Sequence, residues 1–167
     1  MHNLIRINFL PIKALLMVVI IISLLMVNTA IPNDIVFEKR QIIVNGEEYL
    51  VEIAQSAKQR KHGLMFRDHL DKRDGMLFIY PQSGDHRIWM KNTLIPLKVI
   101  WLDNNNLVIG VKTLDPCTSD PCPIYGISKP SKYVLELNNT NHGLKPGIKI
   151  EGLSRILKQE DDSGSTL

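Results

Sequence analysis

The stretch Arg87–Lys91 is the part of the sequence that points most clearly to ligand chemistry. In an extended strand alternate side chains share a face, so Trp89 lies between two cations on one face, while the other face is apolar and is expected to join the core. Asn92 and Thr93 follow, and both can donate and accept hydrogen bonds. An aromatic platform with flanking cations and amide donors suits a sugar or a small anion.

Two residues elsewhere in the chain could complete such a site. Arg67 offers a planar guanidinium that suits a carboxylate or a phosphate, and Glu136 offers a carboxylate. The alternative interpretation is structural: Trp89 covers an edge of the core, and Arg67 or Lys91 forms an ion pair with Glu136. The predicted ligand-binding set is Arg67, Trp89, Lys91, Asn92, Thr93 and Glu136.

No catalytic residue, metal site or cofactor is predicted, because no segment resembles a nucleophile elbow, a catalytic triad, a phosphate loop or a zinc motif. Met65, Met76 and Met90 with His86 would suit Cu(I). Methionine also fills irregular cores, and each of these residues has apolar neighbours, so we favour core packing.

The only two cysteines are Cys117 and Cys122. In an exported chain such a pair predicts a disulfide. Four residues separate them, which is not the Cys-x-x-Cys spacing of redox-active pairs. We therefore predict a structural disulfide.

The N-terminal segment has the pattern of a secretory signal peptide. Arg6 and Lys13 precede the apolar run 14–27, and Asn28-Thr29-Ala30 follows it. The alternative is an uncleaved N-terminal anchor in the inner membrane, formed by residues 14–27. In both cases the remainder is expected outside the cytoplasm, in the periplasm or the extracellular space, with membrane contact only through an uncleaved leader.

The organisation predicted from composition is a leader (1–30), a linker (31–36), a single β-rich domain (37–158) and a disordered polar tail (159–167). Of the 20 Lys and Arg residues two lie in the leader, and all 17 acidic residues follow it, so residues 31–167 carry a net charge of +1. Nucleic-acid-binding domains usually carry a clear excess of basic residues, which this near-neutral segment lacks. We therefore exclude nucleic acid as a partner.

Local signals predict the elements of the domain. Asn45-Gly46 suits a type I′ turn between strands at Arg40–Val44 and Glu48–Ala54. Ser56 and Gln59 form a capping box, and Gly63 suits a C-cap, so a helix is expected at Ala57–His62. Further strands are expected at Met76–Tyr80 (stopped by Pro81), Arg87–Lys91, Leu97–Leu102, Leu107–Leu114, Lys132–Leu137 and Lys149–Leu157. The fold class is therefore mainly β, a compact β-sandwich or partly closed barrel with one short helix near residues 57–62.

Several motifs carry a family resemblance: Gly63–Arg67 (GLMFR), Gly75–Phe78 (GMLF), Trp89–Leu97 (WMKNTLIPL) and Tyr133–Leu137 (YVLEL). Over roughly Val44–Leu153 the chain resembles the family called domain of unknown function 192. The resemblance implies a compact β-rich domain, often exported, in bacteria and archaea, with no established reaction. This chain has Lys98 where relatives usually carry Asp, and Gly152-Leu153 in place of a Gly-Asp pair.

Three functional hypotheses follow from these residues. The first is a non-catalytic module of the cell envelope that binds a small polar or anionic ligand at the residues around Trp89. The second is a hydrolase-like envelope enzyme with Glu136 as acid or base, which requires that carboxyl to lie in a cleft with a perturbed pKa. The third is a structural or protein-docking domain. The sequence does not predict the oligomeric state.

Overall fold

The protein is described by a computed structural model, in which residues 35–140, 143–153 and 156 are placed. These residues belong to a compact unit that spans Ile35–Leu167. The predicted leader (1–30), most of the predicted linker and the predicted tail (159–167) lie outside the described residues. Within the described part of the chain, no helix is long and apolar enough to cross a membrane.

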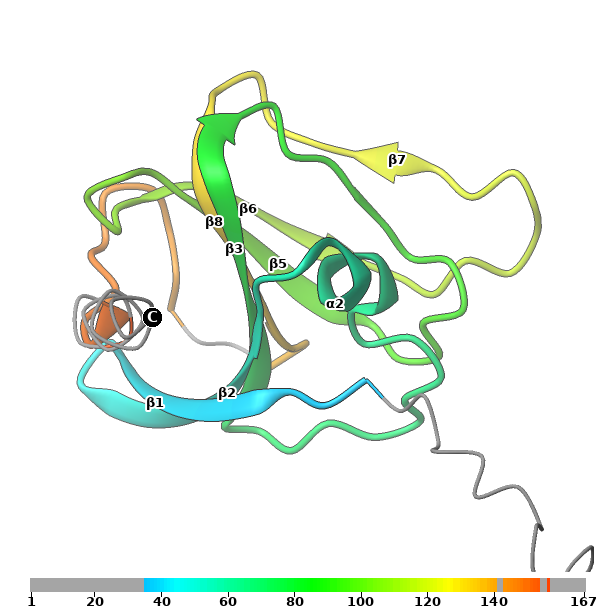
Figure 1. Ribbon diagram of the computed structural model, residues 1–167, viewed down its shortest axis with the longest axis horizontal. Coiled ribbons are helices and arrows are strands. Elements are labelled where there is room, and N and C mark those ends of the chain that lie inside the picture. Colours follow the sequence, from blue (N-terminus) through cyan, green and yellow to red (C-terminus); the bar gives the residue numbers. More distant parts are fainter. Residues whose placement is uncertain (1–34, 141–142, 154–155, 157–167) are drawn as a thin grey trace, which may run out of the picture. The chain divides into compact units, whose positions relative to one another are not determined.

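The domain is built around one mixed sheet of six strands in the order β1-β2-β3-β8-β5-β6 (Figure 1). Only β2 and β3 pair in parallel, and the other neighbours are antiparallel. A second sheet contains β4 and β7. The strands are β1 Glu38–Val44, β2 Glu47–Ala54, β3 Asp74–Gly84, β4 Ile88–Trp89, β5 Leu97–Leu102, β6 Val108–Leu114, β7 Ile124–Tyr125 and β8 Ser131–Asn138.

The sheet curls on itself without closing. Apolar residues of β1 and β2 pack in one cluster with residues of β5, β6 and β8, although β1 and β6 are at opposite edges. Residues 147–151 contact both edge strands: Glu151 exchanges backbone hydrogen bonds with Ile43 of β1, and Val108 of β6 donates to the carbonyl of Ile148. The predicted mainly β fold with one short helix is confirmed for the described residues, and the barrel is not closed.

The hairpin and the helix form where local chemistry predicts them. Asn45 and Gly46 have φ of 50° and 80°, as a type I′ turn between β1 and β2 requires. Helix α2 spans Ala57–His62, and both hydrogen bonds of its capping box are present, from Gln59 N to Ser56 Oγ and from Ser56 N to Gln59 Oε1. Gly63 follows as the C-cap with a positive φ.

Three strand predictions are wrong in extent. β3 continues through Pro81 to Gly84, because its register against β8 shifts between Ile79 and Gly84 and the missing N–H of proline falls in that irregular stretch. The strand predicted at 87–91 is only Ile88–Trp89, since the chain turns where Thr93 N donates to Met90 O. The strand predicted at 149–157 is replaced by isolated bridges at residues 149 and 151; residues 154–155 and 157 lie outside the described residues.

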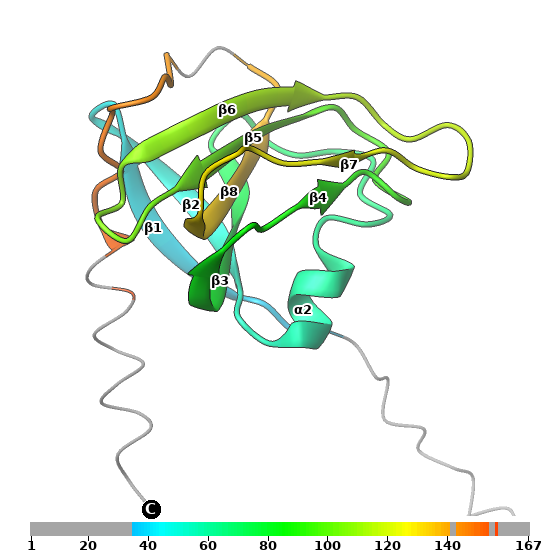
Figure 2. The ribbon, with the colours of Figure 1, turned by 90° about the horizontal axis from the view of Figure 1, so that it is seen from above.

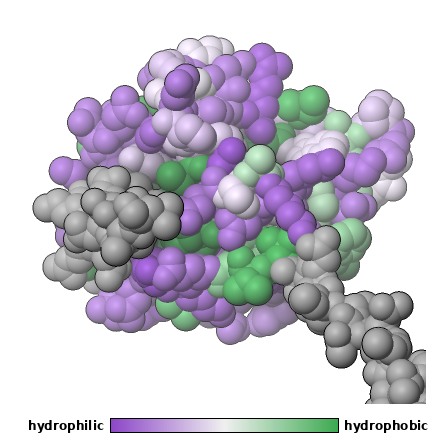
Figure 3. Space-filling model, viewed as in Figure 1, coloured by the Kyte–Doolittle hydropathy of each residue, from purple (hydrophilic) through white to green (hydrophobic). Residues whose placement is uncertain are grey.

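The two faces of the sheet bury separate apolar clusters. The inner cluster lies in the curl of the main sheet. The second cluster, which we call the outer core, contains Phe78, Val99, Trp101 and Val134 of the sheet and is covered by Leu64, which follows α2, and by Ile88 of β4. Figure 2 shows α2 and the β4–β7 pair beside the sheet. On the face shown in Figure 3, hydrophilic side chains predominate and apolar ones form small separate patches.

Candidate functional site

Glu136 is a carboxyl group at a core position. It lies on β8 directly opposite Met76 of β3 and Val99 of β5, so it shares a face of the sheet with the outer core. Only 4% of the residue is exposed. Such positions are normally apolar, because burying a carboxylate without a partner is costly.

A small cavity of about 70 Å³ meets this carboxyl group. It lies between the end of α2 and the residues that follow it, β3, β4 and β8. Phe78 and Tyr80 of β3 and Trp89 of β4 are its aromatic residues. The remaining residues that line it are Arg60, Lys61, His62, Gly63, Leu64, Met65, Arg87, Ile88, Lys91, Thr93 and Glu136.

Burial changes the acidity of two groups in the cavity. Desolvation raises the pKa of Glu136 from 4.5 to about 8. Burial and, to a lesser extent, the nearby Glu136 carboxyl raise the pKa of Tyr80 to about 12, against the opposing effect of the Arg60 guanidinium. Glu136 is therefore mainly neutral at pH 7, when its carboxyl can donate one hydrogen bond as well as accept.

The cations around the cavity are not used to neutralise Glu136. Arg60 donates to the backbone carbonyls of Gln55 and Ile79 and lies 5.2 Å from the Tyr80 ring centroid. Arg87 pairs with Asp85, and Lys91 Nζ lies 3.5 Å from Asp120 Oδ2 and 5.9 Å from the Trp89 ring centroid.

Among the residues that the structure describes, none forms a hydrogen bond or an ion pair with the Glu136 carboxyl group. A native fold rarely leaves a buried polar group in this state without a functional reason or a bound molecule.

The structure brings four of the residues predicted from sequence to this cavity: Trp89, Lys91, Thr93 and Glu136. The alternation predicted for residues 87–91 is present, since Ile88 and Met90 are buried and Trp89 is 41% exposed. Thr93 is almost fully buried, at 6% exposure.

Arg67 and Asn92 lie elsewhere. The Arg67 guanidinium donates to both carboxylate oxygens of Glu52, at 2.9 and 2.7 Å, and does not line the cavity. The backbone carbonyl of Asn92 accepts a hydrogen bond from Phe66 N, and its side-chain amide donates to Met65 Sδ at 4.0 Å. Asn92 lines a separate hollow beside the cysteine loop. The alternative interpretation expected an ion pair between Glu136 and Arg67 or Lys91. The structure contains neither pair, because Arg67 binds Glu52 and Lys91 lies near Asp120.

Sequence reasoning missed Arg60 and Tyr80. Tyr80 had a partial signal, because strand alternation places residues 76, 78 and 80 on one face. The sequence could not show that this face meets Glu136, since that depends on the pairing of Met76 with Glu136 in the folded sheet. Arg60 had no such signal, since its approach to Tyr80 depends on how α2 packs on the sheet.

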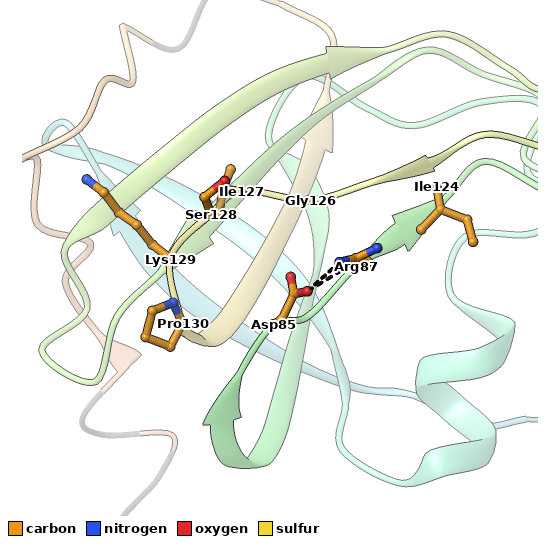
Figure 4. A pocket seen from close by; sticks show the side chains of 8 residues that line it. All are labelled: Asp85, Arg87, Ile124, Gly126, Ile127, Ser128, Lys129 and Pro130. Atoms are coloured by element: carbon orange, nitrogen blue, oxygen red, sulfur yellow. Dashed lines mark hydrogen bonds and ion pairs between the residues drawn. The ribbon is translucent and has the colours of Figure 1, made fainter.

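A larger groove of about 520 Å³ lies beside the segment between β3 and β4 and shares Arg87 with the cavity. Figure 4 shows Arg87 and Asp85 turned toward each other in this groove, with Lys129 extending away from the pair. The other lining residues are Ile124, Gly126, Ile127, Ser128 and Pro130. Because its charged pair is satisfied internally and exposed, the groove has no feature comparable to Glu136.

Cys117 and Cys122 form a disulfide, as predicted. Of the methionines considered for copper, Met76 and Met90 are buried in the outer core, while Met65 lines the cavity. His86 stacks on the Tyr80 ring with centroids 3.5 Å apart. Within the described residues, no cluster of three or more His, Cys, Asp or Glu side chains could hold a metal ion.

Comparisons with known proteins agree with the resemblance seen in the sequence. The model of the family DUF192, described as "Uncharacterized ACR", matches residues 40–152. No curated protein matches the chain.

Two solved structures are similar to this chain. One, described as a "putative transcription regulator" from Sinorhizobium meliloti 1021, is 26% identical with a TM-score of 0.63; the match covers 72% of this chain and 98% of that one. The other, a protein of unknown function from Novosphingobium aromaticivorans, is 27% identical with a TM-score of 0.59, covering 69% of this chain and 84% of that one.

Proposed function

Because the chain belongs to the DUF192 family, whose description assigns no activity, we propose from its own residues that the domain is a non-catalytic module that binds a small polar or anionic ligand. The observation that carries this proposal is the Glu136 carboxyl group, buried yet facing a cavity and without a partner among the described residues. A ligand that hydrogen-bonds to it would supply the missing partner.

The cavity limits the size of the group that enters. One water molecule needs roughly 10–15 Å³ of such volume, so a cavity of about 70 Å³ accepts only a few non-hydrogen atoms. Trp89, 41% exposed at the entrance, offers a stacking surface for the rest of the ligand. The recognised group is thus a small ligand or one end of a larger one.

The predicted leader supports a place for this binding in the cell envelope, either free after cleavage or anchored through residues 14–27. The description of the Sinorhizobium relative as a regulator applies to that protein. The near-neutral charge of residues 31–167 does not favour nucleic-acid binding by this chain.

A thermal-shift panel of sugars, nucleotides, amino acids and organic anions on the full chain tests the proposal. A ligand that raises Tm for the wild type, with the rise lost in Glu136→Gln and Trp89→Ala, supports it. Leu94→Ala is the matched control, because Leu94 is also an exposed apolar residue but does not line the cavity. A panel with no stabilising compound would overturn the proposal.

Acid–base catalysis by Glu136 is the second candidate, and one observation favours it. A pKa of about 8 in a cavity is close to that of an effective general acid or base at neutral pH. Turnover of ester, amide or glycoside substrates, abolished in Glu136→Gln, would support it. If ligands bind and no substrate is turned over, the binding module is the better account.

A further inference from the structure

We propose that the ligand of this cavity is a short zwitterion whose ammonium group enters the cavity to pair with Glu136, while its anionic group stays at the cationic entrance. This inference rests on the proposed function and names the chemical class of its ligand. The arrangement that carries it is a single buried carboxyl group without a partner, aromatic side chains around it, and basic side chains at the same cavity.

The interior of the cavity suits an ammonium group. Glu136 is the only carboxylate that lines it, and no cation of the described residues pairs with it. Phe78 contributes an aromatic ring, and the negative face of such a ring attracts a cation. The Tyr80 ring is already in use, because His86 stacks on it and Arg60 lies 5.2 Å from its centroid. Thr93 adds a hydroxyl that can accept a hydrogen bond from the ammonium.

The entrance of the cavity suits an anion. Lys61 is exposed and has no acidic partner among the described residues, whereas Arg87 and Lys91 are already paired with Asp85 and Asp120. A ligand with only positive charge would be repelled by Lys61, whereas a carboxylate would be attracted to it. A ligand with only negative charge would have to place its anion against the aromatic faces and Glu136. The two ends of the site therefore prefer opposite charges.

The small size of the cavity restricts the ammonium end to an unbranched amine. β-Alanine is a suitable probe, because an aliphatic amine of the Lys type keeps its proton to about pH 10. Propionate lacks the ammonium group, 3-hydroxypropionate carries a hydroxyl in its place, and β-alaninamide lacks the carboxylate. Together these compounds separate the contributions of the two ends.

Proton exchange distinguishes an ammonium ligand from the other classes. The titratable and charged groups that face Glu136 across the cavity are Arg60, Lys61 and His62 of α2, Tyr80 of β3, Arg87 before β4, and Lys91 after it. An ammonium pairs with ionised Glu136, and the pKa of about 8 means that this carboxyl is mainly protonated at pH 7. Binding at pH 7 should therefore release close to one proton, and the affinity should rise about tenfold from pH 6 to pH 7.

Isothermal titration calorimetry of the full chain in buffers of different ionisation enthalpy tests these expectations. β-Alanine should bind with proton release, and propionate and 3-hydroxypropionate should bind at least about tenfold more weakly. Glu136→Gln should remove both the proton release and at least about tenfold in affinity, while Glu48→Gln, at an exposed carboxylate, should change neither. Lys61→Ala should weaken β-alanine but not β-alaninamide, with Lys58→Ala on the same helix as its control.

Two failures have different meanings. If propionate or 3-hydroxypropionate binds as tightly as β-alanine, or if binding takes up a proton, the zwitterion is wrong and the binding module stands. If none of these four probes binds but a panel compound that is not a zwitterion binds in a Glu136-dependent manner, the zwitterion is likewise wrong and the binding module stands. If neither these probes nor the panel bind, both proposals fall.

Discussion

Replacing Glu136 by Gln should make the protein's stability less sensitive to alkaline pH. Gln has nearly the same shape as Glu, can donate and accept hydrogen bonds, and does not titrate. In the wild type the folded protein holds the Glu136 proton up to about pH 8, while the unfolded chain releases it near pH 4.5. The folded state therefore binds more protons than the unfolded state between these values, and stability falls as pH rises.

The size of the effect follows from the pKa difference. The favourable contribution is fully present below pH 4.5 and is lost as pH rises through about 8. Since each pKa unit is worth about 1.4 kcal/mol, the wild type should lose roughly 4 kcal/mol relative to Glu136→Gln between pH 5 and pH 9. The loss should be steepest between pH 5 and pH 8, at about 1.4 kcal/mol per pH unit.

Urea denaturation of both proteins at each pH measures this difference. All other titrating groups are shared, so their contributions cancel when the free energies of unfolding are subtracted. A difference that stays constant from pH 5 to pH 9 would refute the reasoning, because it would mean that Glu136 is not desolvated in the folded protein. If the wild type instead lost stability relative to Glu136→Gln as pH fell below 5, the folded protein would stabilise the ionised carboxylate and lower its pKa.

Two further substitutions test the architecture around the site. Gly75→Ala should destabilise the domain by more than about 3 kcal/mol or prevent folding, because its new Cβ would strike the backbone carbonyl of β8, whereas Gly84→Ala on the same strand meets only ordinary contacts and should cost less than about 1 kcal/mol. Arg67→Ala should lower the free energy of unfolding by about 2 kcal/mol, since it leaves the Glu52 carboxylate, 11% exposed, without its partner. The ligand-induced rise in Tm should survive Arg67→Ala, and its loss would place Arg67 in the site.

Elements set by short-range chemistry could be predicted from sequence. The Asn45-Gly46 turn and the Ser56 capping box depend on residues within a few positions of each other, and both form as expected. The order of the strands could not be predicted, because the pairing of β8 between β3 and β5 joins distant segments. The short strand β7 follows the cysteine loop and carries no periodic pattern of its own.

The candidate site, too, could be predicted only where it depends on residues that are close in sequence. Strand alternation correctly separated the buried Ile88 and Met90 from the exposed Trp89, and Lys91 lies near the Trp89 ring although the strand ends before it. Alternation could not assign Arg67, whose partner Glu52 lies on β2 and comes close only through the packing of the folded chain. Nor could it show that Glu136 occupies a core position, because that depends on both neighbours of β8.

The most direct test of the central claim is the pKa of Glu136 itself. Carbon-13 NMR of the protein labelled at glutamate side chains, with Glu136→Gln to assign the resonance, follows this carboxyl through pH 4 to 10. We expect a midpoint near pH 8, and a shift of that midpoint when a ligand occupies the cavity. A midpoint near 4.5 that no tested ligand changes would contradict the claim that Glu136 is desolvated in the folded protein and forms the binding site.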